Sequence, residues 1–308
     1  MGSLEGKAVV ITGSGGGIGA AYARLAVHEG AAVVVNDLDQ GVVDAMVAEL
    51  VSRGGRATGV AGSVADPDVA ERLVSTSVQA FGALDGLVNN AGVMVVGPPD
   101  DVDVERARGL LEVNVLGTVL CGAAAIRQMR RQGHGSIVNV TSGAHMGLAA
   151  TAVYGASKGA TAALTYDWAT DLVGTGIRVN AVSPMASTQM AVDVLELQGS
   201  TGDELTQRLA GFPTAEDNAP VAIYLLSDLS SAVHGQVVRI DGGELSLVSR
   251  PAIMRPSLTR DGWTVPDVAA AFDGELAGLL NPVGLLEVVG DVTFRSLRAQ
   301  VRRPEDDD

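Results

Sequence analysis

The sequence Ala8-Val9-Val10-Ile11-Thr12-Gly13-Ser14-Gly15-Gly16-Gly17-Ile18-Gly19 decides the fold of this chain. A short apolar run, as in a buried strand, leads directly into a glycine-rich turn, and the residues that follow open a helix. Glycines allow backbone amides to approach a pyrophosphate closely, and the N-terminus of the next helix stabilises its negative charge. The stretch therefore predicts the strand, turn and helix that begin a dinucleotide-binding fold.

The alternation of short apolar runs and helical stretches continues through the first 245 residues. Seven strands are expected, at Ala8–Thr12, Ala32–Asn36, Arg56–Val60, Gly86–Asn89, Ser136–Thr141, Arg178–Val182 and Gln236–Ile240. Helices are expected between them, at Ile18–His28, Val42–Arg53, Pro67–Phe81, Val115–Arg131, Ala152–Val173 and Thr214–Ser227. Strands that are apolar almost throughout suit a parallel sheet with both faces covered. The sequence therefore predicts an α/β fold with a Rossmann-type doubly wound parallel sheet of seven strands.

The alternation stops after Asp241-Gly242-Gly243. We interpret residues 1–245 as one domain that holds both cofactor and catalytic residues, and residues 246–308 as a C-terminal extension too small for a core of its own. One helix is expected from Pro266 to Leu280, and a short apolar stretch runs from Val283 to Val289. The last residues, which end in Glu305–Asp308, are expected to be a disordered, solvated acidic tail.

Charge and composition exclude several classes of partner. The net charge is −15, so the surface repels nucleic acid and anionic membranes. Cys121 is the single cysteine, which leaves no partner for a disulfide within the chain. We find no apolar run of the length of a signal peptide or a membrane helix, and no metal-ligand spacing among the histidines. The sequence predicts a cytoplasmic protein with no metal site.

Residues for a dinucleotide follow the first, second and fourth strands. Gly13, Ser14, Gly17, Ile18 and Gly19 are expected to bind the cofactor from the glycine turn, and Asn90, Ala91 and Gly92 from the end of the fourth strand. Asp37 lies 18 residues after Gly19, close to the usual offset of an acid that binds the adenosine ribose. A carboxylate there repels the 2′-phosphate of NADP, and no Arg or Lys stands beside it in the sequence. We therefore predict NAD.

The chemistry is expected at Tyr154 and Lys158. They are four residues apart, so they share one face of a helix, where an ammonium would make the phenol usable near neutral pH. Of the 21 Lys and Arg residues only Lys7 and Lys158 are lysines, so a lysine at this spacing is notable. Ser142 lies twelve residues upstream of Tyr154.

Together these motifs resemble the short-chain dehydrogenase/reductase family over residues 5–245. They occur in the family's order: the Thr12–Gly19 turn, Asn89-Asn90-Ala91-Gly92, Asn114, Ser142, Tyr154-(Xaa)3-Lys158, Arg178–Pro184 and Ile240–Gly243. The resemblance implies that Tyr154 is the general acid/base on the substrate oxygen. It further implies that Lys158 lowers the pKa of Tyr154 and binds the nicotinamide ribose, that Ser142 bonds the same oxygen, and that Asn114 holds a water that relays protons.

The chain departs from the family pattern in three places. The Ser-to-Tyr spacing is one residue short, so Thr141 competes with Ser142 for the catalytic position; we favour Ser142 because a deletion fits the following loop more easily than the strand. Ser63 replaces the usual Asp after the third strand, so Ser63 and Val64 would contact adenine more weakly or through backbone. Met185 replaces a glycine after Pro184, and Thr188 still offers a partner for the nicotinamide carboxamide. The segment from Met185 to Phe212 is either a flap over the substrate or a packed helix pair.

These features predict an NAD-dependent oxidoreductase that interconverts a secondary alcohol and a ketone on an apolar substrate. Val33–Leu38, Pro184–Met190 and the extension resemble the (R)-3-hydroxyacyl-CoA dehydrogenase unit of peroxisomal multifunctional enzymes, whose bacterial relatives act on acyl thioesters or steroid alcohols. Two alternatives are a biosynthetic 3-oxoacyl reductase and a catalytically silent NAD-binding regulatory or scaffold subunit. The family resemblance also implies a homotetramer or homodimer.

Overall fold

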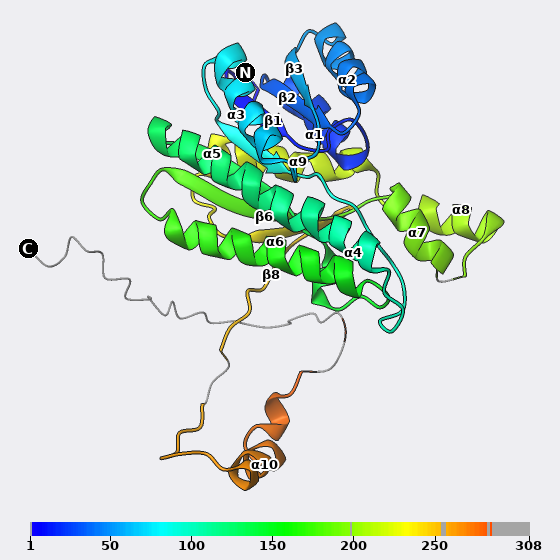
Figure 1. The fold of residues 1–308 in the computed structure, drawn as a ribbon, viewed down its shortest axis with the longest axis vertical. Coiled ribbons are helices and arrows are strands. Elements are labelled where there is room, and N and C mark those ends of the chain that lie inside the picture. The colour runs from blue at the N-terminus through cyan, green and yellow to red at the C-terminus, as the bar shows by residue number, and fades with distance from the viewer. Residues whose placement is uncertain (1, 198, 254–256, 282–283, 285–308) are drawn as a thin grey trace, which may run out of the picture.

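The computed structural model describes residues 2–197, 199–253, 257–281 and 284. Eight strands form one sheet in the order β3-β2-β1-β4-β5-β6-β7-β8 (Figure 1). They are β1 (Ala8–Ile11), β2 (Ala32–Asp37), β3 (Arg56–Ala61), β4 (Gly86–Asn89), β5 (Gly135–Val140), β6 (Ile177–Met185), β7 (Val237–Asp241) and β8 (Glu244–Val248). The first seven run parallel, and the strand order reverses direction at β1. The predicted doubly wound α/β fold is confirmed.

Helices cover both faces of the sheet. The α-helices are α1 (Gly17–His28), α2 (Gln40–Ser52), α3 (Pro67–Phe81), α4 (Val104–Leu111), α5 (Thr118–Gln132), α6 (Ala152–Asp171), α7 (Gln189–Leu197), α8 (Gly202–Ala210), α9 (Ala215–Leu226) and α10 (Val265–Asp273). Four short turns complete them: η1 (Glu112–Gly117), η2 (Gly143–Met146), η3 (Asp228–Ser230) and η4 (Ala277–Leu279). The core cluster of α1, α2 and α9 lies on one face, and that of α3, α5 and α6 on the other.

The eighth strand was not predicted from the sequence. Gly242 adopts a φ of +58°, so the chain reverses between Asp241 and Glu244 and β8 pairs antiparallel with β7. The boundary expected at residue 245 therefore falls inside a strand of the sheet. Leu245 and Leu247 of β8 are both largely exposed.

The helix expected at Val115–Arg131 is part of a longer run. α4, the π-helical turn η1 and α5 follow one another from Val104 to Gln132. By length and composition this run could cross a membrane, but here α5 packs its buried side chains, including Cys121, Ala125 and Met129, against the sheet. Burial raises the pKa of the Cys121 thiol to about 12, so this cysteine is a packing residue.

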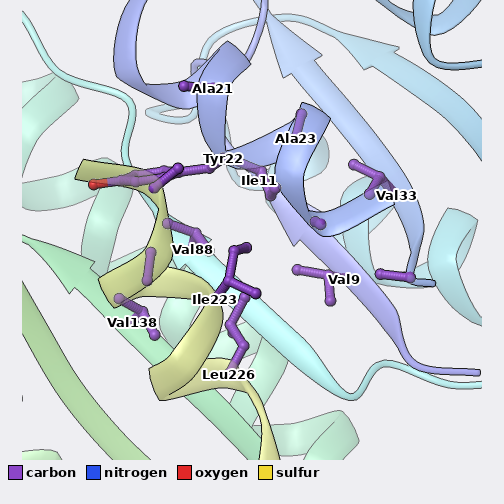
Figure 2. Packing of buried hydrophobic residues seen from close by; sticks show 14 of the residues in the cluster. Val9, Ile11, Ala21, Tyr22, Ala23, Val33, Val88, Val138, Ile223 and Leu226 are labelled. Atoms are coloured by element: carbon purple, nitrogen blue, oxygen red, sulfur yellow. The ribbon is translucent and has the colours of Figure 1, made fainter. Parts of the chain in front are cut away.

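Small aliphatic side chains build both core clusters. On the α1 and α9 face, Tyr22 is the bulky member, packed among residues such as Val88 and Ile223 (Figure 2). Its hydroxyl is buried without a hydrogen-bond partner among the described residues. On the other face, the Trp168 ring of α6 occupies the space that a side chain on Gly122 of α5 would need. The glycine thus allows these two helices to approach closely.

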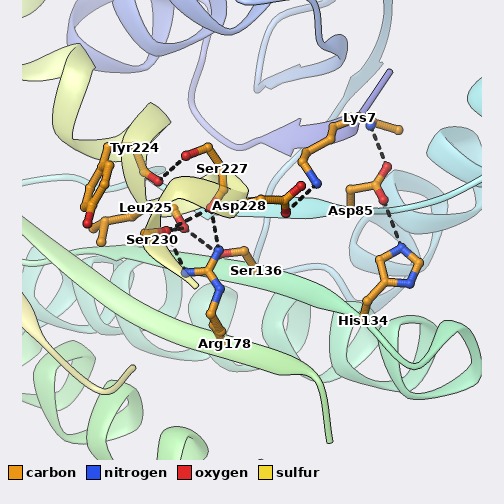
Figure 3. Close-up of polar contacts among 11 residues, drawn as sticks. Lys7, Asp85, His134, Ser136, Arg178, Tyr224, Leu225, Ser227, Asp228 and Ser230 are labelled. Atoms are coloured by element: carbon orange, nitrogen blue, oxygen red, sulfur yellow. Dashed lines mark hydrogen bonds and ion pairs between the residues drawn. The ribbon is translucent and has the colours of Figure 1, made fainter. Parts of the chain in front are cut away.

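A polar network lies at the amino edge of the sheet (Figure 3). The Arg178 guanidinium of β6 donates to the Ser227 carbonyl at 2.9 Å and to Ser230 Oγ at 2.8 Å. Lys7 pairs with Asp228 at 2.9 Å and lowers the pKa of that carboxyl. These contacts fasten the end of α9 and η3 to the sheet.

The described part of the extension leaves the sheet after β8. α10 and η4 lie apart from the sheet in Figure 1. The chain returns at Gly284, whose backbone lies 3.4 Å from the position that a Cβ on Gly147 would occupy. The rest of the expected apolar stretch, Val283 and 285–289, and the acidic tail lie outside the described residues.

Candidate functional site

A cavity of about 770 Å³ lies where the carboxyl ends of the parallel strands meet the glycine turn. Fifteen of the predicted site residues line it: Gly13, Gly17, Ile18, Gly19, Asp37, Ser63, Val64, Asn90, Ala91, Gly92, Ser142, Tyr154, Lys158, Pro184 and Thr188. Ser14 and Asn114 do not line it. The topological switch point of the sheet thus brings together motifs that are up to 175 residues apart.

The glycine turn is held by the end of β4. Asn90 Nδ2 donates to the carbonyls of Thr12 and Gly13, both at 2.9 Å, while Thr12 Oγ1 accepts from the amides of Asn90 and Ala91. Gly13 has a φ of +60°, and a Cβ there would lie 2.8 Å from the Ala91 Cα. A Cβ on Gly19 would lie 2.2 Å from the Gly13 carbonyl oxygen. Only glycine fits either position.

Ser14 has a structural role within this turn. Its hydroxyl donates to the Ile11 carbonyl at 2.7 Å and accepts from the Asn36 amide at 3.2 Å. The side chain is completely buried, and its hydroxyl links β1 to β2 without lining the cavity.

Asp37 marks the far end of the cavity, at the end of β2. Its carboxylate accepts from the Gly15 amide at 3.1 Å and the Leu38 amide at 2.8 Å. Ser63 and Val64 lie on the neighbouring loop after β3, and Ser63 Oγ accepts from the Ala65 amide at 3.2 Å. Arg72 of α3 donates to the Ala61 carbonyl at 3.4 Å but does not line the cavity.

Tyr154 and Lys158 stand together at the other end, on the first turns of α6. The Lys158 Nζ lies 5.7 Å from the centroid of the Tyr154 ring and donates to the Val140 carbonyl at 2.8 Å. Burial lowers the pKa of Lys158 to about 8. Burial raises the pKa of Tyr154, and a hydrogen bond with the Ser142 side chain opposes that rise.

The expected lowering of the Tyr154 pKa is therefore not found in this structure. The lysine faces the ring, and its own charge is disfavoured by burial, so desolvation of the phenol dominates. A buried phenol that is protonated at neutral pH is suited to donate a proton to a substrate oxygen.

The structure separates the two candidates for the catalytic serine position. The Ser142 side chain hydrogen-bonds with Tyr154 and also accepts from the Ala144 amide at 3.2 Å. Thr141 Oγ1 instead donates to the Lys158 carbonyl at 2.9 Å. The Thr141 hydroxyl thus links β5 to α6. The geometry therefore favours Ser142 for the catalytic position.

Asn114 lies behind the cavity, in η1. Its Nδ2 donates to the Val93 carbonyl at 2.9 Å and to Ser157 Oγ at 3.0 Å, and its Oδ1 accepts from the Val93 amide at 2.8 Å. Its carbonyl oxygen accepts from Thr118 Oγ1 at 2.8 Å. A Cβ on Gly92 would lie 3.2 Å from Asn114 Oδ1 and 3.4 Å from Lys158 Nζ. Asn114 therefore joins β4, α5 and α6 next to Lys158.

The segment from Met185 to Phe212 is a helix pair that also lines the cavity. α7 and α8 pack on one another, and Met190, Leu195 and Phe212 contribute apolar walls. The structure therefore shows the packed helix pair, and this pair forms part of the cavity wall. Thr188 lies at the start of α7, where its carbonyl accepts from the Ala191 amide at 2.9 Å.

Two arginines of the cavity were missed from the sequence. Arg208 of α8 and Arg239 of β7 both line it. Arg208 gave no signal, since an arginine on an amphipathic helix is ordinary. Arg239 did: it stands between Val238 and Ile240 in a strand that is otherwise mostly buried, where a charge is unexpected.

The residues present fit a nicotinamide dinucleotide. The glycine turn leaves open space at Gly16 and Gly17, where a Cβ would meet nothing within 4 Å, at the N-terminus of α1. The Asp37 carboxylate lies at one end, and the Tyr154–Lys158 pair at the other, within a single cavity. Backbone amides at a helix N-terminus suit a pyrophosphate, and a carboxylate suits ribose hydroxyls.

Comparison with known proteins agrees with this geometry. A family model described as enoyl-(acyl carrier protein) reductase matches residues 13–244. The chain is 38% identical over 247 residues to 2-(S)-hydroxypropyl-CoM dehydrogenase 3 of Xanthobacter autotrophicus, covering 78% of this chain and 97% of that protein. It is 36% identical over 242 residues to a 3-oxoacyl-(acyl carrier protein) reductase of Thermotoga maritima, covering 78% of this chain and 98% of that protein.

Solved structures show the same arrangement of elements. A short-chain dehydrogenase from Mycobacterium avium superposes with a TM-score of 0.79 and 28% identity, covering 92% of this chain and 98% of that one. An NAD⁺-bound xylitol dehydrogenase gives a TM-score of 0.72 with 32% identity, covering 78% and 99%. A gluconate 5-dehydrogenase from Burkholderia cenocepacia, in complex with NADP and tartrate, gives 0.71 with 30% identity, covering 78% and 95%.

Proposed function

This chain belongs to the short-chain dehydrogenase/reductase family, whose members use nicotinamide cofactors, and from that premise we propose that it interconverts a secondary alcohol and a ketone with NAD. The observation that carries the proposal is the Ser142–Tyr154–Lys158 group at the end of a cavity that begins at the glycine turn. The dinucleotide supplies or accepts the hydride when bound.

Each residue of the group has a role set by its surroundings. In reduction, negative charge develops on the carbonyl oxygen, and the protonated Tyr154 donates to it while the Ser142 hydroxyl stabilises it. In oxidation, Tyr154 accepts the alcohol proton. Lys158 stabilises the resulting phenolate from beneath the ring, and Asn114 holds the helix on which both lie through Ser157.

Replacement of Tyr154 by Phe tests the reaction. We expect kcat to fall by about 10²–10⁴-fold, since the general acid/base is lost. Tyr224→Phe, which removes the hydroxyl of an exposed tyrosine on α9, is the matched control. A Tyr154→Phe protein as active as the parent would show that the tyrosine is not the acid/base. If no assay detected turnover by either the parent or the variant, the result would favour a catalytically silent NAD-binding regulatory or scaffold subunit.

The preference for NAD rests on Asp37. Its carboxylate lines the cavity at the end of β2, where a 2′-phosphate would meet negative charge. Titration of the protein with NADH and NADPH, followed by fluorescence, measures the preference. If Asp37 sets the preference for NADH, Asp37→Ser should weaken that preference. Tighter binding of NADPH by the parent, or a preference that Asp37→Ser leaves unchanged, would overturn the assignment.

We propose a substrate with an apolar body, a 3-hydroxyacyl thioester or a hydroxysteroid. Met190, Leu195 and Phe212 give the substrate end of the cavity its apolar walls. A second candidate, 3-oxoacyl reduction in biosynthesis, is supported by the 36% identity to the reductase of Thermotoga maritima. Reduction of NAD⁺ across hydroxyacyl-CoAs, steroid alcohols and alicyclic alcohols, beside NADPH oxidation with 3-oxoacyl thioesters, separates the two.

We further propose that the protein is a cytoplasmic homotetramer or homodimer. Exposed Leu245 and Leu247 on β8, with Leu229 at η3, support a contact between copies because they would lose solvent exposure there. Sedimentation velocity at micromolar concentration tests this, and a single monomeric species would contradict it.

A further inference from the structure

Arg239 places a positive charge beside the catalytic serine. Its Nη1 lies 3.0 Å from the position that a Cβ on Gly143 would occupy, and Gly143 directly follows Ser142. Any larger residue at position 143 would therefore crowd the guanidinium. The glycine leaves room for Arg239 at the wall of the cavity where the reacting oxygen is expected.

The guanidinium is oriented from one side only. Arg239 Nη2 donates to Asp241 Oδ2 at 2.7 Å, two residues along β7. Within the part of the chain that the structure describes, Nε and Nη1 have no hydrogen-bond partner. The side chain is 24% exposed, and Arg239 lines the cavity. Asp241 thus holds one nitrogen and leaves the other donors for a ligand.

The charges around the cavity are unequally distributed. The whole chain carries −15, yet Asp37 is the single carboxylate side chain among the described residues that line the cavity, and it lies at the far end. Arg208, which donates to Ser200 Oγ at 2.6 Å, lines the wall formed by α8. Apart from Asp37, the charged side chains that line the described cavity are cationic, so an anionic group of a substrate would meet positive charge there although the chain as a whole is negative.

We propose that Arg239 is a specificity-determining residue that binds a carboxylate on the substrate, so that the preferred substrates are secondary hydroxy acids or keto acids with an apolar body. The inference rests on the proposed alcohol–ketone chemistry, and within that chemistry it places free acids before thioesters and neutral steroid alcohols. A planar guanidinium with free donors matches a carboxylate, and a charge-assisted bond in a partly desolvated cavity discriminates against a neutral analogue.

The test compares each acid with its uncharged ester. 3-Hydroxyoctanoate and methyl 3-hydroxyoctanoate, and 4-hydroxycyclohexanecarboxylate and its methyl ester, are assayed with NAD⁺ and NADP⁺. We expect kcat/KM of the parent to favour the acid, and the acid-to-ester ratio to fall by roughly tenfold or more in Arg239→Gln. Arg239→Lys should recover part of the ratio. Arg108→Gln, which breaks an exposed ion pair with Glu105, is the control and should leave the ratio unchanged.

Asp241→Asn separates substrate binding from a merely structural ion pair. If Arg239 only held Asp241, the two variants would change the ratio alike. If Arg239 binds the substrate carboxylate, Asp241→Asn keeps the guanidinium and removes its competitor, so the ratio stays or rises. Equal falls in Arg239→Gln and Asp241→Asn would overturn the inference, as would a parent that prefers the ester.

A binding measurement keeps the inference independent of turnover. The acid should raise the Tm of the parent and of Arg108→Gln, and should not raise that of Arg239→Gln. Turnover of the neutral esters alone would refute the carboxylate inference and leave the proposed function intact. Absence of turnover of every alcohol, together with the acid's Tm shift, would refute the proposed function while supporting Arg239 as an anion site.

Discussion

Lys158 holds its amine in an almost fully buried position, and burial lowers its pKa to about 8. In the unfolded chain a lysine titrates near 10.4. Between these two values the unfolded state binds more protons than the folded state, so this residue makes the protein more stable as the pH rises. Below pH 8 both states are protonated, and the cost of burying the charge is constant.

Lys158→Met removes this dependence. Because the variant has no amine to titrate, the free energy of unfolding of the parent should gain about 2 kcal/mol on the variant between pH 7 and pH 9.5. Urea unfolding of both proteins at the two pH values measures the difference, and other titrating groups cancel in the comparison. If the parent gained no stability relative to the variant between the two pH values, Lys158 would keep an ordinary pKa in the folded protein.

Tyr22 offers a prediction of the opposite kind, a stabilising substitution. Burial raises the pKa of its phenol, and the hydroxyl has no hydrogen-bond partner among the described residues. Tyr22→Phe removes a desolvated polar group and keeps the ring, so the free energy of unfolding should rise by about 1 kcal/mol. Thermal unfolding measures this, with the exposed Tyr224→Phe as the neutral control. A lower Tm would reveal a hydrogen bond to Tyr22 Oη that the structure does not show.

The sequence predicts residues that act through fixed spacing, and it is less informative where a side chain's partner is distant in the chain. The four-residue spacing of Tyr154 and Lys158 and the position of Asp37 at the end of β2 follow from helix and strand geometry alone. The choice of Ser142 over Thr141 is supported by a contact that only the structure shows: the Thr141 hydroxyl donates to the Lys158 carbonyl. Arg239 faces the cavity because β7 lies beside β6 in the sheet. The local sequence pattern does not reveal this pairing.

Among the elements, β6 and α9 are joined by the guanidinium of Arg178. It donates to the Ser227 carbonyl and to Ser230 Oγ, and burial lowers its pKa without depriving it of its charge. Arg178→Met would remove the charged donor of both acceptors at the amino edge of the sheet, although Ser230 Oγ still donates to the Ser227 carbonyl. We expect the free energy of unfolding to fall by about 2 kcal/mol.

Chemical denaturation of Arg178→Met measures the loss, with Arg53→Met as control. Arg53 is exposed and pairs with Glu49 on the surface of α2, so its replacement should change stability by less than about 0.5 kcal/mol. Similar small losses in both variants would mean that water replaces Arg178 as donor.

Element boundaries were predictable where a cap or turn residue marks them. Asp66-Pro67 begins α3 as expected, with the Asp66 side chain accepting from the Asp68 amide. β8 was missed because it forms by pairing with β7, and a five-residue run after Gly243 gives little signal alone. The π-helical turn at Asn114 was missed for a similar reason, since its contacts to Val93 and Ser157 come from other elements.

For the molecule as a whole, the extension divides into two parts with different roles. β8 belongs to the sheet, and Arg250 just after it donates to the Gly235 carbonyl at 3.0 Å. Beyond it, the chain returns to the body at Gly284, beside Gly147 and near Leu148, which lines the cavity. We therefore expect the part after residue 251 to act on substrate entry and the part before it to act on stability.

Two truncated proteins test this division. The protein 1–251 should keep the Tm of the parent and show a KM for substrate changed by a few-fold or more. The protein 1–243 should have a lower Tm, because the edge of β7 loses its partner strand. A 1–251 protein unchanged in KM, in Tm and in sedimentation would show that the extension covers neither the cavity nor an interface.

The close packing of α5 and α6 also places a tryptophan, a natural fluorophore, inside the domain. The chain has two tryptophans, Trp168 in the helix contact over Gly122 and Trp263, 44% exposed, in the extension with the Arg260 guanidinium 5.2 Å from its ring centroid. Trp168→Phe leaves emission from the extension alone, and Trp263→Phe leaves emission from the domain alone. The motions of the two parts can thus be followed separately by fluorescence, with no dye attached.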